Sequence, residues 1–116
     1  MLDAWLKEVK QTADPESLGM ILVHDGIVRG ISKTGQHIQG MHLSYDKEKL
    51  DQVVSTLRTR EGIVDIRVWI NGGKLKLGDD IMLVLVAGRF RTDILPVFVE
   101  LLTTIKNEIV QEEEML

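Results

Sequence analysis

An uninterrupted apolar segment, Ile81 to Ala87, places the strongest constraint on how this chain folds. The segment is far shorter than the roughly 18 apolar residues that a membrane-spanning helix needs. A short run of this kind, in which no residue faces water, is typical of a strand covered on both sides. We therefore expect it to form the central strand of a sheet.

Other segments alternate between apolar and polar residues and are predicted to be strands. The clearest covers residues 64–70, where every second residue is apolar and one face is therefore buried. Further strands are expected at residues 20–28, from Gln36 to Tyr45, and at 74–77, with a turn at 71–73 before the last of these. A polar loop, Gly30 to Gly35, separates the first two.

Three segments show apolar residues at the i, i+3, i+4 and i+7 spacing of amphipathic helices. The first covers residues 2–9, and the second follows Asp46, a plausible N-cap, and ends near Gly62, which suits a left-handed conformation. The third and longest is expected to start at Asp93, with Pro96 in its first turn. Its buried stripe comprises Ile94, Phe98, Leu101, Leu102, Ile105 and Ile109. The resulting order, α-β-β-α-β-β-β-α, indicates an α+β sandwich.

Composition narrows the class of protein further. The 116 residues suffice for one domain, so residues 1–116 are expected to form a single unit. There are no cysteines, which excludes a disulfide scaffold, a thiolate zinc site and a cysteine nucleophile. A net charge of −4 and few aromatic residues argue against a nucleic-acid partner. No apolar stretch of signal-peptide type begins the chain, so we expect a cytoplasmic protein without a membrane partner.

Two familiar kinds of site are disfavoured. The loop Gly30 to Gly35 holds Lys33 and Thr34, but a phosphate-binding loop requires a glycine before the lysine and a helix after the loop. His37 and His42, if they share one strand, point to opposite faces and cannot chelate together. We therefore expect neither a metal site nor a cofactor.

Arginines at two strand ends are the first candidate binding groups. Arg29 follows the strand at 20–28, and Arg89 and Arg91 follow the central strand. Two such ends could converge into an anion pocket, because guanidinium groups bind phosphate or carboxylate with two hydrogen bonds. The alternative is that these arginines are solvated charges at the ends of elements.

Lys106 is the second candidate, on the last helix one turn after Leu102. At 100° per residue it flanks the apolar stripe, where partial burial would favour a neutral amine able to act as an acid, base or nucleophile. Alternatively, its amine extends to water while its methylene groups pack.

Several motifs together resemble the large, catalytic subunit of molybdopterin synthase. They are Gly26-Ile27-Val28-Arg29 with Leu43-Ser44-Tyr45, Gly73-Lys74-Leu75-Lys76-Leu77-Gly78-Asp79, Phe90-Arg91, and Lys106 on the last helix. The resemblance covers roughly residues 18–108, with the motifs in the right order and spacing. It implies an α/β-hammerhead-like domain with a mixed or antiparallel sheet and a long C-terminal helix.

The resemblance also implies a function. In that family, the domain forms a homodimer, and a small ubiquitin-like subunit inserts its C-terminal thiocarboxylate into a pocket. Sulfur passes to cyclic pyranopterin monophosphate, and two rounds build the dithiolene of molybdopterin. Lys106 would then be catalytic, in proton transfer or on the thiocarboxylate carbonyl. Arg29 and Arg91, the latter from the other protomer, would bind anions, with Lys33, Phe90 and Leu102 as further substrate-binding candidates.

Two departures from the family pattern support an alternative. Phe90 stands where the family has histidine, and Glu113 stands where it has a second functional lysine. If the last helix continues, Glu113 lies on nearly the same face as Lys106, where its charge would repel anions. The chain also stops at Leu116, where family members run on. The alternative is therefore a catalytically degenerate relative that serves as a pterin- or anion-binding module or as a protein-interaction module.

Overall fold

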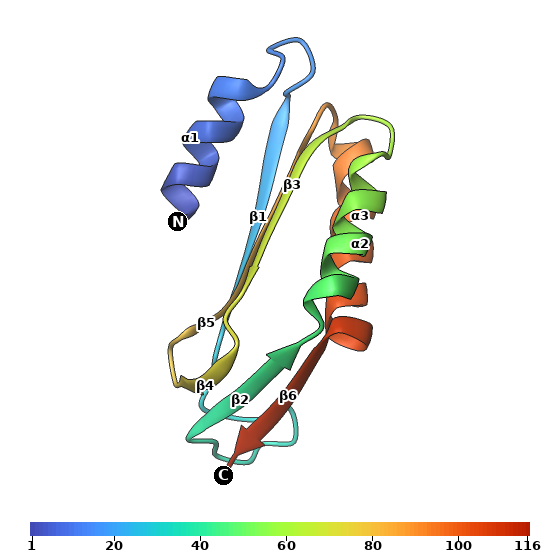
Figure 1. The fold of residues 1–116 in the computed structure, drawn as a ribbon. Coiled ribbons are helices and arrows are strands. Elements are labelled where there is room, and N and C mark those ends of the chain that lie inside the picture. The colour runs from blue at the N-terminus through green and yellow to red at the C-terminus, as the bar shows by residue number, and fades with distance from the viewer.

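A computed structural model describes all 116 residues, as two three-stranded sheets with helices packed on the larger one (Figure 1). The molecule is elongated, 49 × 25 × 23 Å, and the smaller sheet forms the end that carries the C-terminus. This arrangement confirms the predicted α+β fold with an antiparallel sheet and a C-terminal helix. No helix in the structure is both long enough and apolar enough to span a membrane.

The larger sheet has the apolar run at its centre. Strand β5 (Asp80–Gly88) lies between β1 (Met20–Ile27) and β3 (Ile63–Ile70), and both neighbours are antiparallel to it. Met20 pairs with Gly88 at one end of the β1–β5 ladder, and Ile27 pairs with Asp80 at the other. The middle of β5 is completely buried, which confirms the expected central strand.

Helices cover both faces of this sheet (Figure 1). Helix α1 (Leu2–Thr12) packs on one face through a small cluster around Val9, Leu85 and Ala87. Helices α2 (Lys47–Arg58) and α3 (Arg91–Thr104) pack on the other face. There they complete the main hydrophobic core, in which Ile66, Ile94 and Leu101 have no exposed surface.

The smaller sheet includes a strand that the sequence did not predict. Its order is β4 (Gly73–Lys76), β2 (Gly40–Tyr45) and β6 (Val110–Met115). Strand β2 begins at Gly40 rather than at Gln36, because the loop before it makes only an isolated bridge between Ile31 and His37. His37 and His42 therefore do not share a strand, contrary to the expectation above.

The last helix ends sooner than expected, in a π-helical turn, η1 (Ile105–Ile109). The Val110 amide donates to the Ile105 carbonyl, five residues back, and the Asp46 amide donates to the Ile109 carbonyl at 3.0 Å. The chain then leaves as β6. The expectation that Glu113 shares a helical face with Lys106 is therefore wrong: Glu113 lies on a strand, paired with His42 of β2.

Two residues were predicted to start helices, Asp46 and Asp93. The prediction is confirmed for Asp46 and wrong for Asp93. Asp46 caps α2, where its carboxylate accepts from the Lys49 amide at 3.1 Å. Helix α3 instead begins at Arg91, with Phe90 as N-cap, while the Asp93 carboxylate accepts from Arg89 Nε at 3.1 Å. Pro96 consequently lies in the second turn, where it removes one backbone hydrogen bond. Gly62, with φ of +79°, has the predicted left-handed conformation.

We expect the substitution Asp46→Ala to lower the free energy of unfolding by about 1 kcal/mol, because it leaves the Lys49 amide without its acceptor. Urea denaturation measures the change. Asp51→Ala is the matched control, since it removes an exposed ion pair with Lys47 from the same helix and is expected to cost less than about 0.5 kcal/mol. Equal losses for the two variants would contradict a capping role for Asp46.

Candidate functional site

The candidate cations Arg29 and Lys33 lie at the end of the large sheet nearest the small sheet. Arg29 follows β1, is exposed, and donates from Nε to the Ile31 carbonyl at 2.9 Å. That bond orients the side chain and leaves the outer guanidinium nitrogens free. Lys33 is exposed in the adjoining loop, whose turn is closed by the hydroxyl of the buried Ser32 accepting from the Gln36 amide. An arginine held in this way can bind an anion without further ordering.

Phe90 and Arg91 lie at the opposite end of the same sheet. They follow β5, whose last residue, Gly88, pairs with Met20 at the start of β1. Eight residues of extended strand separate this end from Arg29, which corresponds to roughly 26 Å. Within one chain the two arginine-bearing strand ends therefore do not converge, because two antiparallel neighbours finish at opposite ends of the ladder that they form.

Arg89 and Arg91, which their position after the central strand did not distinguish, have different surroundings. Arg89 bonds to Asp93 and also approaches Glu61 at 3.6 Å. The hydrogen bond to Asp93 is the main reason why the pKa of Arg89 is raised above its usual value. Its guanidinium also lies 4.8 Å from the centre of the exposed Phe90 ring. Arg89 is thus held within the fold, whereas Arg91 is exposed and makes no ion pair.

Lys106 lies toward the Arg29 end of the sheet. Helix α3 runs back along β5, so the residues from Arg91 to Lys106 span about 20 Å of helix. Leu102 and Phe98, one and two turns earlier, are half-buried, and Phe98 meets the His24 ring of β1 edge-on at 6.5 Å. Lys106 itself is exposed on η1, so the predicted partial burial is not found in the single chain. A π-turn at this position is notable, because such turns recur at functional sites.

None of the candidate cations forms an ion pair with a carboxylate of this chain. Six of the 14 Lys and Arg side chains form ion pairs within the fold: Lys47, Lys49, Arg58, Arg60, Arg67 and Arg89. Arg29, Lys33, Arg91 and Lys106 are all among the others. Their charges are therefore available to an anionic ligand, and no intramolecular partner must be displaced first.

Glu113 is exposed on β6, directly opposite His42, and Glu112 and Glu114 beside it are also exposed. None of the three carboxylates forms an ion pair. Because β6 is a strand, Glu113 faces the opposite side of the small sheet from its two neighbours. No three or more histidine, aspartate or glutamate side chains are arranged so that they could hold a metal ion.

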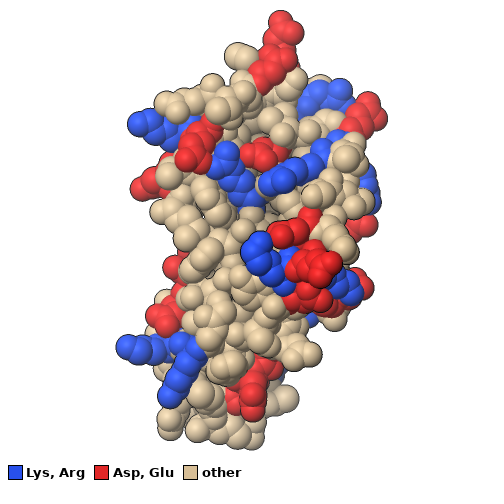
Figure 2. Space-filling model, in the orientation of Figure 1, with Lys and Arg blue, Asp and Glu red and all other residues tan.

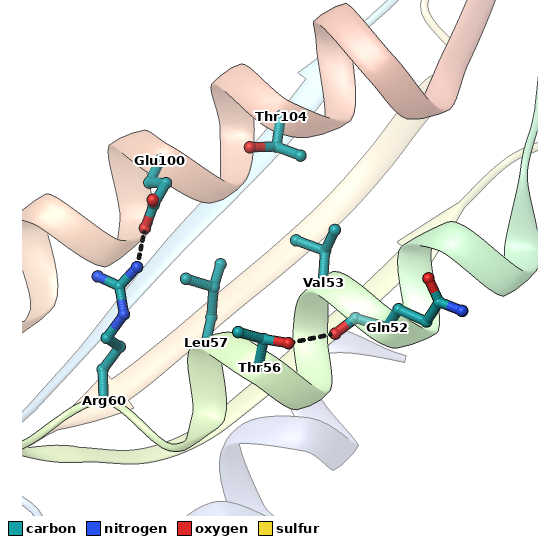
Figure 3. Close-up of a pocket in the computed structure, with 7 residues that line it drawn as sticks. All are labelled: Gln52, Val53, Thr56, Leu57, Arg60, Glu100 and Thr104. Carbon is teal, nitrogen blue, oxygen red and sulfur yellow. Dashed lines mark hydrogen bonds and ion pairs between the residues drawn. The ribbon is translucent and has the colours of Figure 1, made fainter.

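The sequence analysis missed a groove between the two helices of the main core, shown in Figure 3. Its volume is about 340 Å³, and Val53 and Leu57 of α2 form its apolar part. Arg60 and Glu100 bridge it with an ion pair of 2.9 Å. None of the candidate cations lines this groove. No motif points to it, since it arises only where α2 and α3 come together.

Asp25 and Asp80 form an unfavourable pair of carboxylates beside the β1–β5 ladder. The hydrogen bond to Asp80 is the main reason why the pKa of Asp25 is raised above 3.8, the remainder coming from desolvation and from the charge of Asp80. The folded state thus binds a proton at Asp25 more tightly than the unfolded state does. The stabilising contribution is present below pH 3.8 and is lost as pH rises through the raised pKa.

We therefore expect Asp25→Asn to raise the melting temperature at pH 7, because the substitution removes the carboxylate that lies unfavourably beside Asp80. The gain should shrink toward zero as pH falls below 3.8, the usual pKa of the group. Thermal denaturation across this pH range tests the effect. Asp80→Asn should give the same gain, and the double variant little more, because both changes relieve one repulsion. Additive gains would show that the two carboxylates do not interact.

Comparison with known proteins places the chain in a family. The family model described as MoaE protein matches residues 2–108. No match was found among curated proteins. Among solved structures, a molybdopterin synthase from Staphylococcus aureus is similar at 19% identity with a TM-score of 0.76, over 94% of this chain and 82% of that one.

Two further structures have the same 19% identity and TM-score of 0.76. One is a protein-protein complex of subunits 1 and 2 of molybdopterin-converting factor from Helicobacter pylori, matched over 97% of this chain and 74% of that one. The other is molybdopterin cofactor biosynthesis protein E from Burkholderia multivorans, matched over 97% of this chain and 78% of that one. At this identity the structures establish the shared fold.

The family match covers nearly the whole chain, from α1 to η1, and includes every candidate cation. The chain therefore belongs to the MoaE protein family, the large-subunit family of molybdopterin synthase. This membership connects it with molybdenum cofactor biosynthesis.

Proposed function

We propose that this protein is a sulfurtransferase, the large subunit of a molybdopterin synthase. It would transfer sulfur from the C-terminal thiocarboxylate of a small ubiquitin-like partner to cyclic pyranopterin monophosphate, and two transfers would form the dithiolene. The observation that carries the proposal is the family match over residues 2–108, which includes Arg29, Arg91 and Lys106. The complex of subunits 1 and 2 from Helicobacter pylori supports a small-subunit partner for this chain as well.

The unpaired cations support an anionic substrate. The pterin carries a phosphate, and the partner's tail is a thiocarboxylate before transfer and a carboxylate afterwards. Arg29, already held by the Ile31 carbonyl, can present two N–H groups to such an anion. Lys33 would add positive charge from the neighbouring loop. In this proposal Lys106 exchanges a proton or polarises the thiocarboxylate carbonyl, and Leu102 packs beside it.

The separation of Arg29 from Arg91 supports a homodimer. In one chain the two arginines lie at opposite ends of β1. A two-fold axis that runs the two β1 strands antiparallel would bring Arg91 of each copy to the Arg29 end of the other. Lys106, exposed in the single chain, would then lie in a site formed by two copies, where water is partly excluded and its interactions with anions are stronger.

A single-turnover assay tests the proposal. The protein is mixed with the thiocarboxylated small subunit from the same genome and with cyclic pyranopterin monophosphate, and dithiolene formation is followed. We expect product in amounts limited by the thiocarboxylate, and none when the small subunit ends in an ordinary carboxylate. Small-subunit binding without product would refute sulfur transfer.

The second candidate function, a catalytically degenerate binding or interaction module, rests on Phe90 and Glu113. The unpaired carboxylates of β6 repel anions that approach this end of the molecule. The substitution Glu113→Lys separates the two functions. An inactive parent that gains product formation on this change would support the degenerate module, whereas an active parent excludes it.

A further inference from the structure

The connection between the two sheets is an asparagine-glycine pair that the candidate site does not use. Strand β3 ends at Ile70 and β4 begins at Gly73, so Asn71 and Gly72 join them. Figure 1 shows the chain passing here from the large sheet to the small one. An asparagine that precedes glycine is prone to spontaneous deamidation, because glycine has no Cβ to hinder the reaction.

Deamidation is a reaction of the backbone with the asparagine side chain. The backbone nitrogen of the next residue loses its proton to base and attacks the side-chain carbonyl carbon, Cγ. A C–N bond forms to close a succinimide ring, and the side-chain nitrogen leaves as ammonia. Water then opens the ring at either carbonyl and gives aspartate or isoaspartate. The sum is water consumed and ammonia released, and no oxidant, reductant or cofactor takes part.

The backbone nitrogen of Gly72 is free to make this attack. Gly72 is exposed, and its amide donates no hydrogen bond to a backbone or side-chain acceptor. The Asn71 amide, by contrast, donates to the Ile81 carbonyl at 2.9 Å. The attacking nitrogen therefore has no hydrogen bond to break before it reacts.

Positive charge close to Gly72 favours the reaction further. The attacking species is a deprotonated amide, and nearby cations stabilise such an anion. Lys74 and Lys76 of β4 follow Gly72 in the chain and are exposed. In Figure 2, basic groups project on the side where Figure 1 places β4. The charge around the connection thus acts in the same direction as the absence of a Cβ.

Asn107 is the other asparagine of the chain, and its surroundings oppose the reaction. It lies inside η1, where the hydrogen bonds of the helical turn hold the backbone amides in place. The residue after it is Glu108, whose side chain crowds the approach to Cγ. Asn107 is therefore an internal reference for the reactivity of Asn71.

The side chain of Asn71 also helps to hold the two sheets together. Its Nδ2 donates to the Asp80 carbonyl of β5 at 2.9 Å, in a partly buried contact. An ionised aspartate has no hydrogen to donate at this point, so two oxygens would face each other without a proton between them. Isoaspartate also adds a methylene group to the backbone of a very short connection. Both products therefore weaken the attachment of β4 to the large sheet.

We propose that Asn71 is a site of spontaneous deamidation, and that this slow modification loosens the joint between the large and small sheets. The reaction needs only water and base, so it does not depend on the proposed sulfur transfer. It gives the protein a covalent change that accumulates with age at the connection between β3 and β4.

Ageing of the intact protein tests the reaction. The protein is incubated at neutral and at mildly alkaline pH, and its peptides are analysed by mass spectrometry for the exchange of NH for O. We expect deamidation at Asn71 to be at least tenfold faster than at Asn107. It should also be faster at the higher pH, because the Gly72 amide must lose its proton. Equal rates at the two asparagines would overturn the proposal.

Gly72→Ala is the matched variant for the reactivity of Asn71. Gly72 does not have a positive φ, and a Cβ added to it would lie 3.4 Å from the ring of Tyr45, so the fold can accept alanine here. The added methyl group crowds the attacking nitrogen, and we expect deamidation at Asn71 to become at least fivefold slower. An unchanged rate would contradict attack by the Gly72 nitrogen.

Asn71→Asp tests the structural effect, because aspartate is one product of the reaction. We expect its melting temperature at neutral pH to be about 4 °C or more below that of the parent, since the Asp80 carbonyl loses its donor. Asn107→Asp is the control, because Asn107 is exposed and makes no side-chain hydrogen bond, and its shift should be less than half as large. Equal shifts for the two variants would refute the loosening of the joint.

Discussion

Replacement of Lys106 by alanine is expected to lower the single-turnover rate of dithiolene formation by about 10²- to 10⁴-fold, the range observed when a group that transfers protons is removed. Because Lys106 is exposed and makes no ion pair within the chain, its loss should change the free energy of unfolding by less than about 0.5 kcal/mol. Loss of activity with unchanged stability would therefore locate the effect in the reaction.

Lys10→Ala is the matched control for this prediction. Lys10 is also an exposed lysine in a helix without an ion pair, but it lies on α1, on the other face of the large sheet. Its replacement should leave the rate within twofold of the parent. If the two alanine variants had equal rates, Lys106 would be a solvated lysine with no part in sulfur transfer.

The largest effect on stability is expected from Leu101→Ala. Leu101 has no exposed surface and lies on the face of α3 that packs against the large sheet, within the main core. Removing its side chain forfeits transfer free energy and leaves a cavity, at a cost of about 2–5 kcal/mol. That cost is a large part of the free energy of unfolding of such a domain, which is about 5–15 kcal/mol.

Leu95→Ala on the same helix is the control for the core substitution, because Leu95 is 41% exposed. Urea denaturation should show a loss of less than about 1 kcal/mol for this variant. Both substitutions replace leucine by alanine in one helix and so change helix propensity equally. A loss for Leu95→Ala that matched that of Leu101→Ala would mean that α3 is not docked as described.

The parts of the fold that sequence predicts are those in which apolar and polar residues follow a clear local pattern. The unbroken apolar run identified β5, and the alternation at residues 64–70 identified β3, because strand geometry sends successive side chains to opposite faces. Asp46 was recognised as a cap because a short acidic side chain before a helical pattern can accept from a free amide. These signals depend on a few neighbouring residues, and the structure confirms them.

Strand β6 could not be predicted in this way. Three of the six residues 110–115 are glutamates, the segment shows no apolar alternation, and all but its terminal residues are exposed. They are a strand because their backbone pairs with β2, from Val110 opposite Tyr45 to Met115 opposite Gly40. That pairing depends on a segment some seventy positions earlier in the chain, which no local pattern records.

Residue type and position along the chain were enough to identify the candidate site residues. Arg29 and Arg91 are candidates because guanidinium groups at strand ends suit phosphate and carboxylate. Lys106 is one because a lysine at the flank of an apolar stripe can act as an acid, base or nucleophile. How these residues are distributed in space became clear from the folded chain. Antiparallel pairing of β1 with β5 sends Arg29 and Arg91 to opposite ends of the sheet, and the π-turn leaves Lys106 toward the Arg29 end. The physical reason is that charge and periodicity are local properties, whereas strand direction and register are set by contacts between distant segments.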